Sequence, residues 1–423
     1  MGRLLIEAVG SPRPAALPAL ALGALAALLL LAARPAPAAV NEFDASADVL
    51  AVGSDGQRSF LDGGLGELRY DEHNEGLQLD NLRFGYRGIF ADIVHVTVEA
   101  VSYEDRPSVP LDLTQAFVEV RPFPRGPWRS RLKVGAFYAP ISMENRLQGW
   151  RSAYSLTPSA INTWVGEELR TFGAEYDLDW LGRQRGHDWE LGVGASLFGW
   201  NESAGELLQE RGWAMHDRQA TLFGRIGSAT SETIDEERLL TAAGAARAGY
   251  YVDGSAKYLD TLELRALHYD NRADPNAYSD AANNWPWHTH FDSTGIRWTP
   301  SAHWTLISQW LAGSTCSNVE YFFDCWNFAA EFVLASWQRG ADRLTARYDR
   351  FDMDQTPAPI AGAFSYNDHG HAFTVAYERE INRHLSLALE VLQINSSLTS
   401  RLELGEPAGA TERQLELAVR LQL

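Results

Sequence analysis

Lysine, cysteine and long hydrophobic runs are all scarce in this sequence, and these scarcities narrow the class of protein. Lys133 and Lys257 are the only lysines among the 423 residues, and the formal net charge is −19. Binding to nucleic acid needs a basic surface, so we expect no nucleic-acid partner. After Val40, no apolar stretch is long enough to span a bilayer as a helix. Any membrane that the chain enters beyond this point must therefore be entered as strands.

The first forty residues carry the one long apolar run. Two arginines precede an apolar stretch over residues 15–33, and the sequence PAPAAV at 35–40 offers small residues for cleavage. An uncleaved anchor helix is the alternative, because the run approaches spanning length. A proline and a glycine interrupt the run, and its small-residue ending is typical of a secretory signal peptide. We therefore predict a signal peptide over 1–39 and one exported domain over 40–423.

The only two cysteines, Cys316 and Cys325, lie close together in one predicted loop. Export to an oxidising compartment favours a disulfide between them over two free thiols. Ligation of a metal ion is the alternative. We predict the disulfide and no metal site.

Alternation of apolar and polar residues is abundant in the chain. In the last twelve residues, one face of a period-two strand carries Leu415, Leu417, Val419, Leu421 and Leu423. The intervening positions carry Gln414, Glu416, Ala418, Arg420 and Gln422. A strand with lipid on one face and water on the other needs this pattern, and strands can span a bilayer only as a closed barrel.

The alternation recurs in sixteen segments separated by turn and loop signals. The predicted strands are 43–52, 77–87, 93–103, 111–121, 129–138, 169–179, 188–200, 249–258, 261–270, 291–298, 304–313, 326–337, 343–351, 372–380, 385–394 and 412–423. Short and longer connections alternate, and an even count returns both chain ends to one side. We predict an all-β fold: a transmembrane antiparallel β-barrel with short periplasmic turns and longer extracellular loops.

Two alternatives stay open at this point. Around residues 230–258, a strand over 222–228 with a helix over 236–246 would also fit. A soluble barrel or sandwich could show the same alternation, because its apolar face would be hidden in a protein core. Aromatic residues near strand ends favour the membrane barrel, whose interfacial girdles need them. These residues are Trp180, Trp189, Trp200, Trp298, Trp304, Trp326 and Trp337.

A barrel of sixteen strands is wide enough to leave an aqueous lumen. The predicted basic lining is Arg83, Arg87, Arg131, Lys133, Arg265, Arg297, Arg343, Arg347 and Arg420. The predicted acidic lining is Glu99, Glu175, Asp177, Glu190, Glu263, Glu331, Asp349, Glu378, Glu390 and Glu416. Selectivity comes from the charges at the narrowest point. Each of these residues fits a general polar lining as well as a specific binding role.

The loop over residues 140–167 is the predicted constriction of this pore, because long loops within compact folds are usually functional. It and the residue after it carry charges of both signs that could face each other: Glu144, Arg146, Arg151, Glu167 and Glu168. An external loop packed on the rim is the alternative. Arg83, Arg131, Lys133, Arg343 and Arg347 are the pore-lining candidates on the strands.

A second long loop, over residues 201–247, is predicted to be extracellular. Its residues Arg211, His216, Asp217, Arg218 and Arg225 could bind a polar solute or belong to a lid without specific binding.

Motifs of catalysis are absent from the sequence. It contains no GxSxG, P-loop, HExxH or CxxC, and we expect neither enzymatic activity nor a cofactor. One rival hypothesis is a barrel-embedded hydrolase that uses His216, His288 or His369. A second rival is a plugged structural or adhesive barrel.

Four stretches resemble one family of outer-membrane porins. RLKVGAFYAPISMEN at 131–145 and SAINTWVGEELRTFGAEY at 159–176 resemble the strand–loop–strand region of the phosphate-selective O/P-type porins of Gram-negative bacteria. TVAYEREINRHLSLALE at 374–390 and TERQLELAVRLQL at 411–423 resemble their final hairpins. The chain departs from that family in having two lysines and in ending at Leu423, where an aromatic residue is usual.

The resemblance implies a porin in the outer membrane of a Gram-negative bacterium, through which ions or small polar solutes diffuse passively. Its expected partners are outer-membrane lipid and small hydrophilic solutes, and a barrel of this size could assemble as a homotrimer. The low lysine content argues against phosphate as the solute.

Overall fold

The structure, a computed structural model, describes residues 40–104, 110–199, 201, 203–226, 234–235, 247–277, 286–319, 322–357 and 365–423. The predicted signal peptide over 1–39 and the alternative helix over 236–246 lie outside the described residues. Within the described ranges, no helix is long and apolar enough to cross a membrane.

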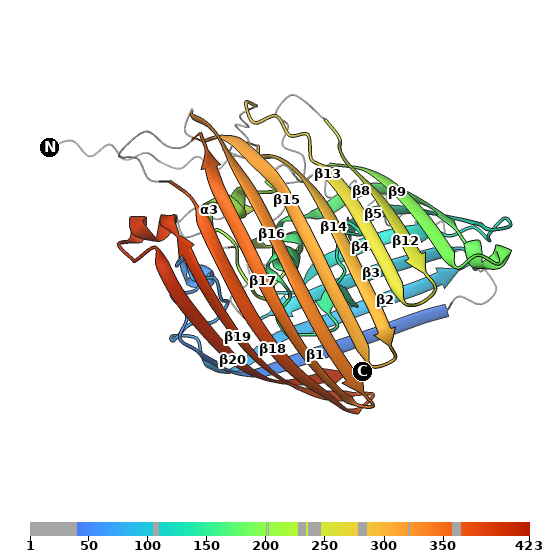
Figure 1. The fold of residues 1–423 in the computed structure, drawn as a ribbon, viewed down its shortest axis with the longest axis horizontal. Coiled ribbons are helices and arrows are strands. Elements are labelled where there is room, and N and C mark those ends of the chain that lie inside the picture. The colour runs from blue at the N-terminus through green and yellow to red at the C-terminus, as the bar shows by residue number, and fades with distance from the viewer. Residues whose placement is uncertain are drawn as a thin grey trace.

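Sixteen antiparallel strands form one closed barrel (Figure 1). In order around the barrel they are β1 (Val40–Ser54), β2 (Gly76–Phe90), β3 (Val94–Tyr103), β4 (Asp112–Val120), β5 (Trp128–Tyr138), β8 (Arg170–Trp180), β9 (Trp189–Gly199), β12 (Gly249–Tyr258), β13 (Leu262–Asp270), β14 (His288–Ser301), β15 (Trp304–Val319), β16 (Phe322–Arg339), β17 (Asp342–Thr356), β18 (Asp368–Asn382), β19 (Leu385–Leu398) and β20 (Gly409–Gln422). Neighbours in this order pair with each other, and β1 pairs with β20 to close the sheet. The predicted fold class and its sixteen strands are confirmed.

The remaining elements lie in the connections. The short strands β6 (Asn145–Leu147) and β7 (Arg151–Ser152) pair with each other, as do β10 (Arg225–Ile226) and β11 (Ile234–Asp235). The described helical elements are α2 (Ala160–Glu168), α3 (Glu206–Arg211), η1 (Phe60–Asp62), η2 (Gly182–Arg185) and η3 (Thr399–Leu404). Of the alternative strand over 222–228, the described residues 225 and 226 form β10, which pairs with β11 and not with a barrel strand.

The alternation of the sequence becomes an apolar outside and a polar inside. On β20, Leu415 and Leu417 are each 50% exposed, whereas Glu416 between them is 4% exposed. On β18, Phe373 and Val375 are likewise half-exposed. A soluble sheet protein would hide such side chains, so the soluble alternative is wrong. The apolar belt that they form faces lipid.

Short turns join the strands at one end of the barrel, which we call the short-turn end. Most connections at the other end, the loop end, are longer. In transmembrane barrels the short turns lie in the periplasm.

Glu331 and Trp326 on β16 lie on the opposite faces of the barrel wall from those predicted. Glu331 points outward and is exposed, whereas Trp326 is buried inside the barrel. The inner face of this strand is apolar, and Phe328, Phe332 and Leu334 are buried there. Loop residues that fill the lumen cover this face, so protein rather than water meets it. Both predictions were wrong because they assumed a water-filled lumen along β16.

A β-bulge in β2 turns one more residue inward than the alternation predicts. Asp48 of β1 pairs with Asn81, and Val49 pairs with Leu79, so Asp80 has no partner across the ladder. Bulges redirect side chains in this way. Asp80 and Asn81 are therefore both buried, although they are adjacent in sequence.

Three largely buried segments fold from the loop end into the lumen. We call them lumen loop 1 (residues 55–75), lumen loop 2 (139–169) and lumen loop 3 (203–224). The described part of the predicted extracellular loop 201–247 is mainly lumen loop 3, and it lies within the barrel.

An aromatic core holds lumen loops 2 and 3 against the inner wall. Trp164 of lumen loop 2 and Trp213 of lumen loop 3 both lie edge-on to Phe328 of β16, with ring centroids 5.0 and 6.3 Å away. Trp164 also meets Phe291 of β14 edge-on, at 5.5 Å. This part of the lumen is therefore filled by a packed apolar core.

Candidate functional site

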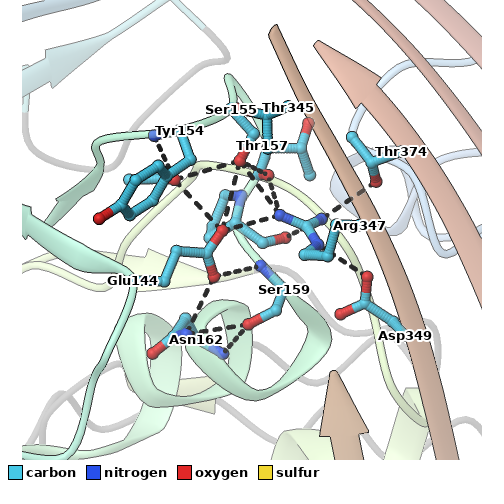
Figure 2. A network of polar contacts seen from close by, with 12 residues as sticks. Glu144, Tyr154, Ser155, Thr157, Ser159, Asn162, Thr345, Arg347, Asp349 and Thr374 are labelled. Carbon is cyan, nitrogen blue, oxygen red and sulfur yellow. Dashed lines mark hydrogen bonds and ion pairs between the residues drawn. The ribbon is translucent and has the colours of Figure 1, made fainter. Parts of the chain in front are cut away.

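Glu144 and Arg347 join lumen loop 2 to the barrel wall (Figure 2). Arg347, on β17, donates from Nη1 to Glu144 Oε1 at 2.8 Å and from Nε to Asp349 Oδ2 at 2.7 Å. The side chains of Glu144 and Arg347 are 0% exposed. These two candidates therefore anchor the loop and do not border an open passage.

The start of helix α2 lies in the same network. Ser159 caps the helix, because its Oγ accepts a hydrogen bond from Asn162 N at 3.3 Å. Ala160 N donates to Asp349 Oδ1 at 3.2 Å, and Ser159 N donates to Glu144 Oε2 at 3.0 Å. The helix dipole stabilises carboxylates at a helix N-terminus. The helix thus begins where the loop is fastened to β17.

Arg146 and Arg83 hold lumen loop 2 to two other strands. Arg146 Nη1 lies 2.8 Å from Glu263 Oε2 on β13. Arg83, on β2, donates to Gly149 O at 3.1 Å and to Gln219 Oε1 of lumen loop 3 at 2.8 Å. Together with Arg347 on β17, these contacts fasten the loop at three places around the wall.

Glu167 and Glu168, at the end of α2, hold lumen loop 3. Glu167 pairs with Arg211 and lies 3.0 Å from His216 Nε2. Burial raises the pKa of Glu167, but Arg211 and His216 outweigh it and lower the pKa to about 2. Glu168 accepts a hydrogen bond from Leu207 N at 2.9 Å, in the first turn of α3. Burial raises the pKa of Glu168 to about 8.

Arg131 and Lys133, on β5, are paired with acidic residues of β8. Arg131 Nε lies 2.8 Å from Asp177 Oδ2, and Lys133 Nζ lies 2.6 Å from Glu175 Oε1. Each of these candidates is thus neutralised by its cross-strand neighbour.

A charged cluster links β1 and β20 with lumen loop 2. Arg420 Nε lies 3.0 and 3.1 Å from the carboxylate oxygens of Asp48. Arg151 Nη1 lies 3.7 Å from Asp48 Oδ2, beyond hydrogen-bonding distance. Burial, together with the nearby Arg420 and Arg83, lowers the pKa of Arg151 to about 9. We call Asp48, Arg151 and Arg420 the neck cluster.

Sequence reasoning missed Asp48 in this cluster. Arg420 was expected in the lumen and Arg151 in the constriction, and the structure brings both to Asp48. The period-two pattern of β1 could have placed Asp48 inward, but nothing in the sequence joins positions so far apart.

Three cavities that are lined by described residues lie along the lumen, and Arg420 of the neck cluster lines all three. A cavity of about 290 Å³ opens at the short-turn end, and Arg151, Arg343 and Arg420 are in its lining. Cavities of about 20 Å³ and 10 Å³ lie deeper, and Asp48 and Arg420 line both. A single water needs about 10–15 Å³. The polar space therefore narrows to the width of single water molecules at the neck cluster.

Cys316 and Cys325 form a disulfide. They lie directly opposite each other in β15 and β16, so the bond crosses a hairpin and does not close an irregular loop.

The histidines of the hydrolase hypothesis lie in separate places. His216 is buried beside Glu167 in the lumen. His288 and His369 lie on the outer face near the loop end, 3.1 Å from Asp270 and 3.4 Å from Asp354 respectively. Within the described part of the chain, no group of three or more His, Cys, Asp or Glu residues could hold a metal ion.

Comparison with known proteins finds similarity in structure only. No protein-family model matches the sequence, and no curated protein sequence matches it. A loop-deletion mutant of OmpT, an outer membrane protein of Vibrio cholerae, matches with a TM-score of 0.54 at 6% identity, over 91% of this chain and 100% of that chain. The outer membrane channel DcaP of Acinetobacter baumannii matches with a TM-score of 0.53 at 10% identity, over 91% and 97%. The anion-selective porin from Comamonas acidovorans matches with a TM-score of 0.52 at 10% identity, over 91% and 100%.

The chain has the porin fold. At such low identity the common feature is the closed membrane barrel itself, which is the architecture of proteins of the Gram-negative outer membrane. The narrower resemblance to phosphate-selective O/P-type porins is not supported by these matches.

Proposed function

We propose that the protein is an outer-membrane porin through which ions or small polar solutes diffuse passively. The observation that carries the proposal is a series of polar cavities that share Arg420, inside a barrel with a lipid-facing belt. The proposal involves no cofactor and no energy source. Lipid would cover the belt, and a homotrimer is the assembly that we propose for a barrel of this size.

The proposed constriction is the neck cluster, and Arg151 is the residue of lumen loop 2 that reaches it. Arg151 and Arg420 flank one carboxylate, that of Asp48. The other charged residues predicted for the constriction are engaged elsewhere: Glu144 binds Arg347, and Arg146 binds Glu263. We therefore assign selectivity to Arg151 rather than to the whole set of loop charges.

Single-channel recording in planar bilayers tests this assignment. We expect discrete conductance steps, and reversal potentials in a salt gradient give the ion preference. Arg151→Ala should raise the conductance and move the reversal potential towards cation preference, because it removes a positive side chain from the narrowest point. Arg146→Ala is the matched control, since its side chain is bound to β13. If both variants keep the parental conductance and reversal potential, the constriction lies elsewhere.

A plugged barrel is the second candidate function. The observation that favours it is the filling of the lumen by three loops, which leaves cavities of about 20 Å³ and 10 Å³ at the neck cluster. A plugged barrel gives no conductance steps at any voltage or salt concentration. The same recording therefore distinguishes the two functions.

A further inference from the structure

The cavity of about 290 Å³ at the short-turn end, which we call the vestibule, is lined by charges of both signs. Its charged residues are Arg151, Arg343, Glu378, Glu380, Arg383 and Arg420. Its size is close to the lower limit of pockets for small organic ligands, roughly 300 Å³. The vestibule opens between the turns that follow β16 and β18, so a solute can enter it without passing the neck cluster.

Most arginines of the vestibule are already engaged. Arg420 pairs with Asp48 at 3.0 Å. Arg343 donates to Gln338 Oε1 at 2.8 Å and lies over the ring of Tyr154, 5.3 Å from its centroid. Arg383 donates to the ring of the adjacent His384 at 2.8 Å. These side chains contribute to the local field, and each already has at least one partner within the protein.

In this lining, one arginine has a buried donor without a hydrogen-bond acceptor, and one carboxylate has no hydrogen-bond or ion-pair partner within the part of the chain that the structure describes. Arg151 Nη1 is buried and makes no hydrogen bond to any described residue. Glu378 makes no hydrogen bond or ion pair of 4 Å or less with the described residues, although it lies directly opposite Arg343 in the β17–β18 ladder. A buried donor without a partner is costly. Arg151 does donate from Nε to Gln148 O at 3.2 Å, and its Nη1 lies 3.7 Å from Asp48. One cavity is thus lined by a cation with an unused donor and by a carboxylate that accepts no hydrogen bond from the described residues.

We propose that the vestibule binds a small zwitterion of the α-amino-acid class. Its carboxylate accepts hydrogen bonds from Arg151, and its ammonium group donates to Glu378. A ligand with a single charge would satisfy only one of these two groups, and hydrogen bonds between ionised groups are the stronger kind. The proposal rests on the proposed diffusion function and specifies the class of solute for it.

Three probes of nearly equal size test this proposal: L-alanine, L-lactate and alaninamide. Lactate has the carboxylate without the ammonium group, and alaninamide has the ammonium group without the carboxylate. Saturation-transfer NMR titration of the detergent-solubilised barrel measures binding whether or not the barrel conducts. We expect alanine to bind about tenfold more tightly than either single-charge probe, the difference that one charged hydrogen bond makes.

Substitutions then separate the two ends of the solute. Glu378→Gln should weaken alanine about tenfold and leave lactate unchanged, whereas Arg151→Gln should weaken both alanine and lactate. Arg151→Lys should restore part of the alanine binding, which shows that a loss in Arg151→Gln is not a folding defect. Glu331→Gln and Arg350→Gln are the matched controls, because both residues are exposed on the outer face of the barrel.

Equal binding of the three probes, or alanine binding unchanged in both glutamine variants, would overturn the proposal and mark these charges as merely hydrated. The outcome is independent of conductance. A barrel that binds alanine but shows no conductance steps keeps the site and refutes diffusion. A conducting barrel without preference for alanine refutes the site alone.

Discussion

Replacement of Arg347 by methionine tests whether one buried cation fastens lumen loop 2 to the wall. Arg347 donates to the carboxylates of Glu144 and Asp349, and to the carbonyl oxygens of Thr157 at 2.8 Å and Pro158 at 3.0 Å. Its side chain is 0% exposed. Water therefore cannot replace these hydrogen bonds unless the loop moves.

The expected loss of stability follows from what the substitution leaves behind. Methionine fills much of the volume, but Glu144 and Asp349 stay buried without their cation. Removal of one partner from a buried ion pair costs about 3–5 kcal/mol. The double variant Glu144→Gln, Arg347→Met should be less destabilised than the sum of its single variants, by about 0.5–3 kcal/mol, because the two residues are in direct contact.

Urea unfolding in lipid vesicles, followed by tryptophan fluorescence, measures these free energies. Arg343→Met is the control on the same strand, and it should cost less than about 1 kcal/mol because its hydrogen bond is solvent-exposed. Single-channel conductance gives a second readout, since a released loop changes the current. If Arg347→Met unfolds at the parental urea concentration and conducts as the parent does, the loop is not fastened by this residue.

The remaining predictions concern the hairpin and lumen loop 3. Joint replacement of Cys316 and Cys325 by serine should cost less than the roughly 2–4 kcal/mol of a typical disulfide, because the ladder already pairs the two positions; urea unfolding of this variant beside the parent measures the difference. The pKa of Glu168 is raised from 4.5 to about 8, so the stability that it contributes is fully present below pH 4.5 and is lost as the pH rises through 8. Proteolysis of lumen loop 3 should accelerate over that range, and Glu168→Gln should flatten the dependence. The pKa of Glu167 is lowered from 4.5 to about 2, so its contribution is present above pH 4.5 and is lost as the pH falls through 2, which acid titration of tryptophan fluorescence detects. Gly205 has a φ of +97°, and a Cβ there would lie 2.1 Å from Thr315 Oγ1, so Gly205→Ala should displace α3 and speed cleavage of the loop by protease.

The strands could be predicted from the sequence because their two faces meet different solvents. Lipid outside and polar groups inside repeat with a period of two, and this period is visible within a single strand such as β20. The predicted ends were too short on β14 to β19, which continue beyond the belt to residues such as Ser301 and Thr356. Outside lipid the outward face becomes polar, and the pattern that revealed the strands disappears there.

The packing inside the barrel could not be predicted in the same way. Asp80 turns inward only because a bulge breaks the alternation, and Glu331 turns outward where protein fills the lumen. Lumen loop 3 carries no period that distinguishes an external loop from one folded inside. Its position depends on contacts such as that between Trp213 N and Asp368 Oδ2, at 2.8 Å, across a separation of 155 residues.

The pairing of β1 with β20 has a consequence for how the molecule is made. The ladder runs from Ser46–Gln422 to Ser54–Gln414, so the last strand of the barrel in chain order is the partner of its first. Until it arrives, both strands present unpaired backbone edges, which are templates for aggregation. The barrel therefore cannot close strand by strand, and β1 must stay shielded from other chains until β20 has been made.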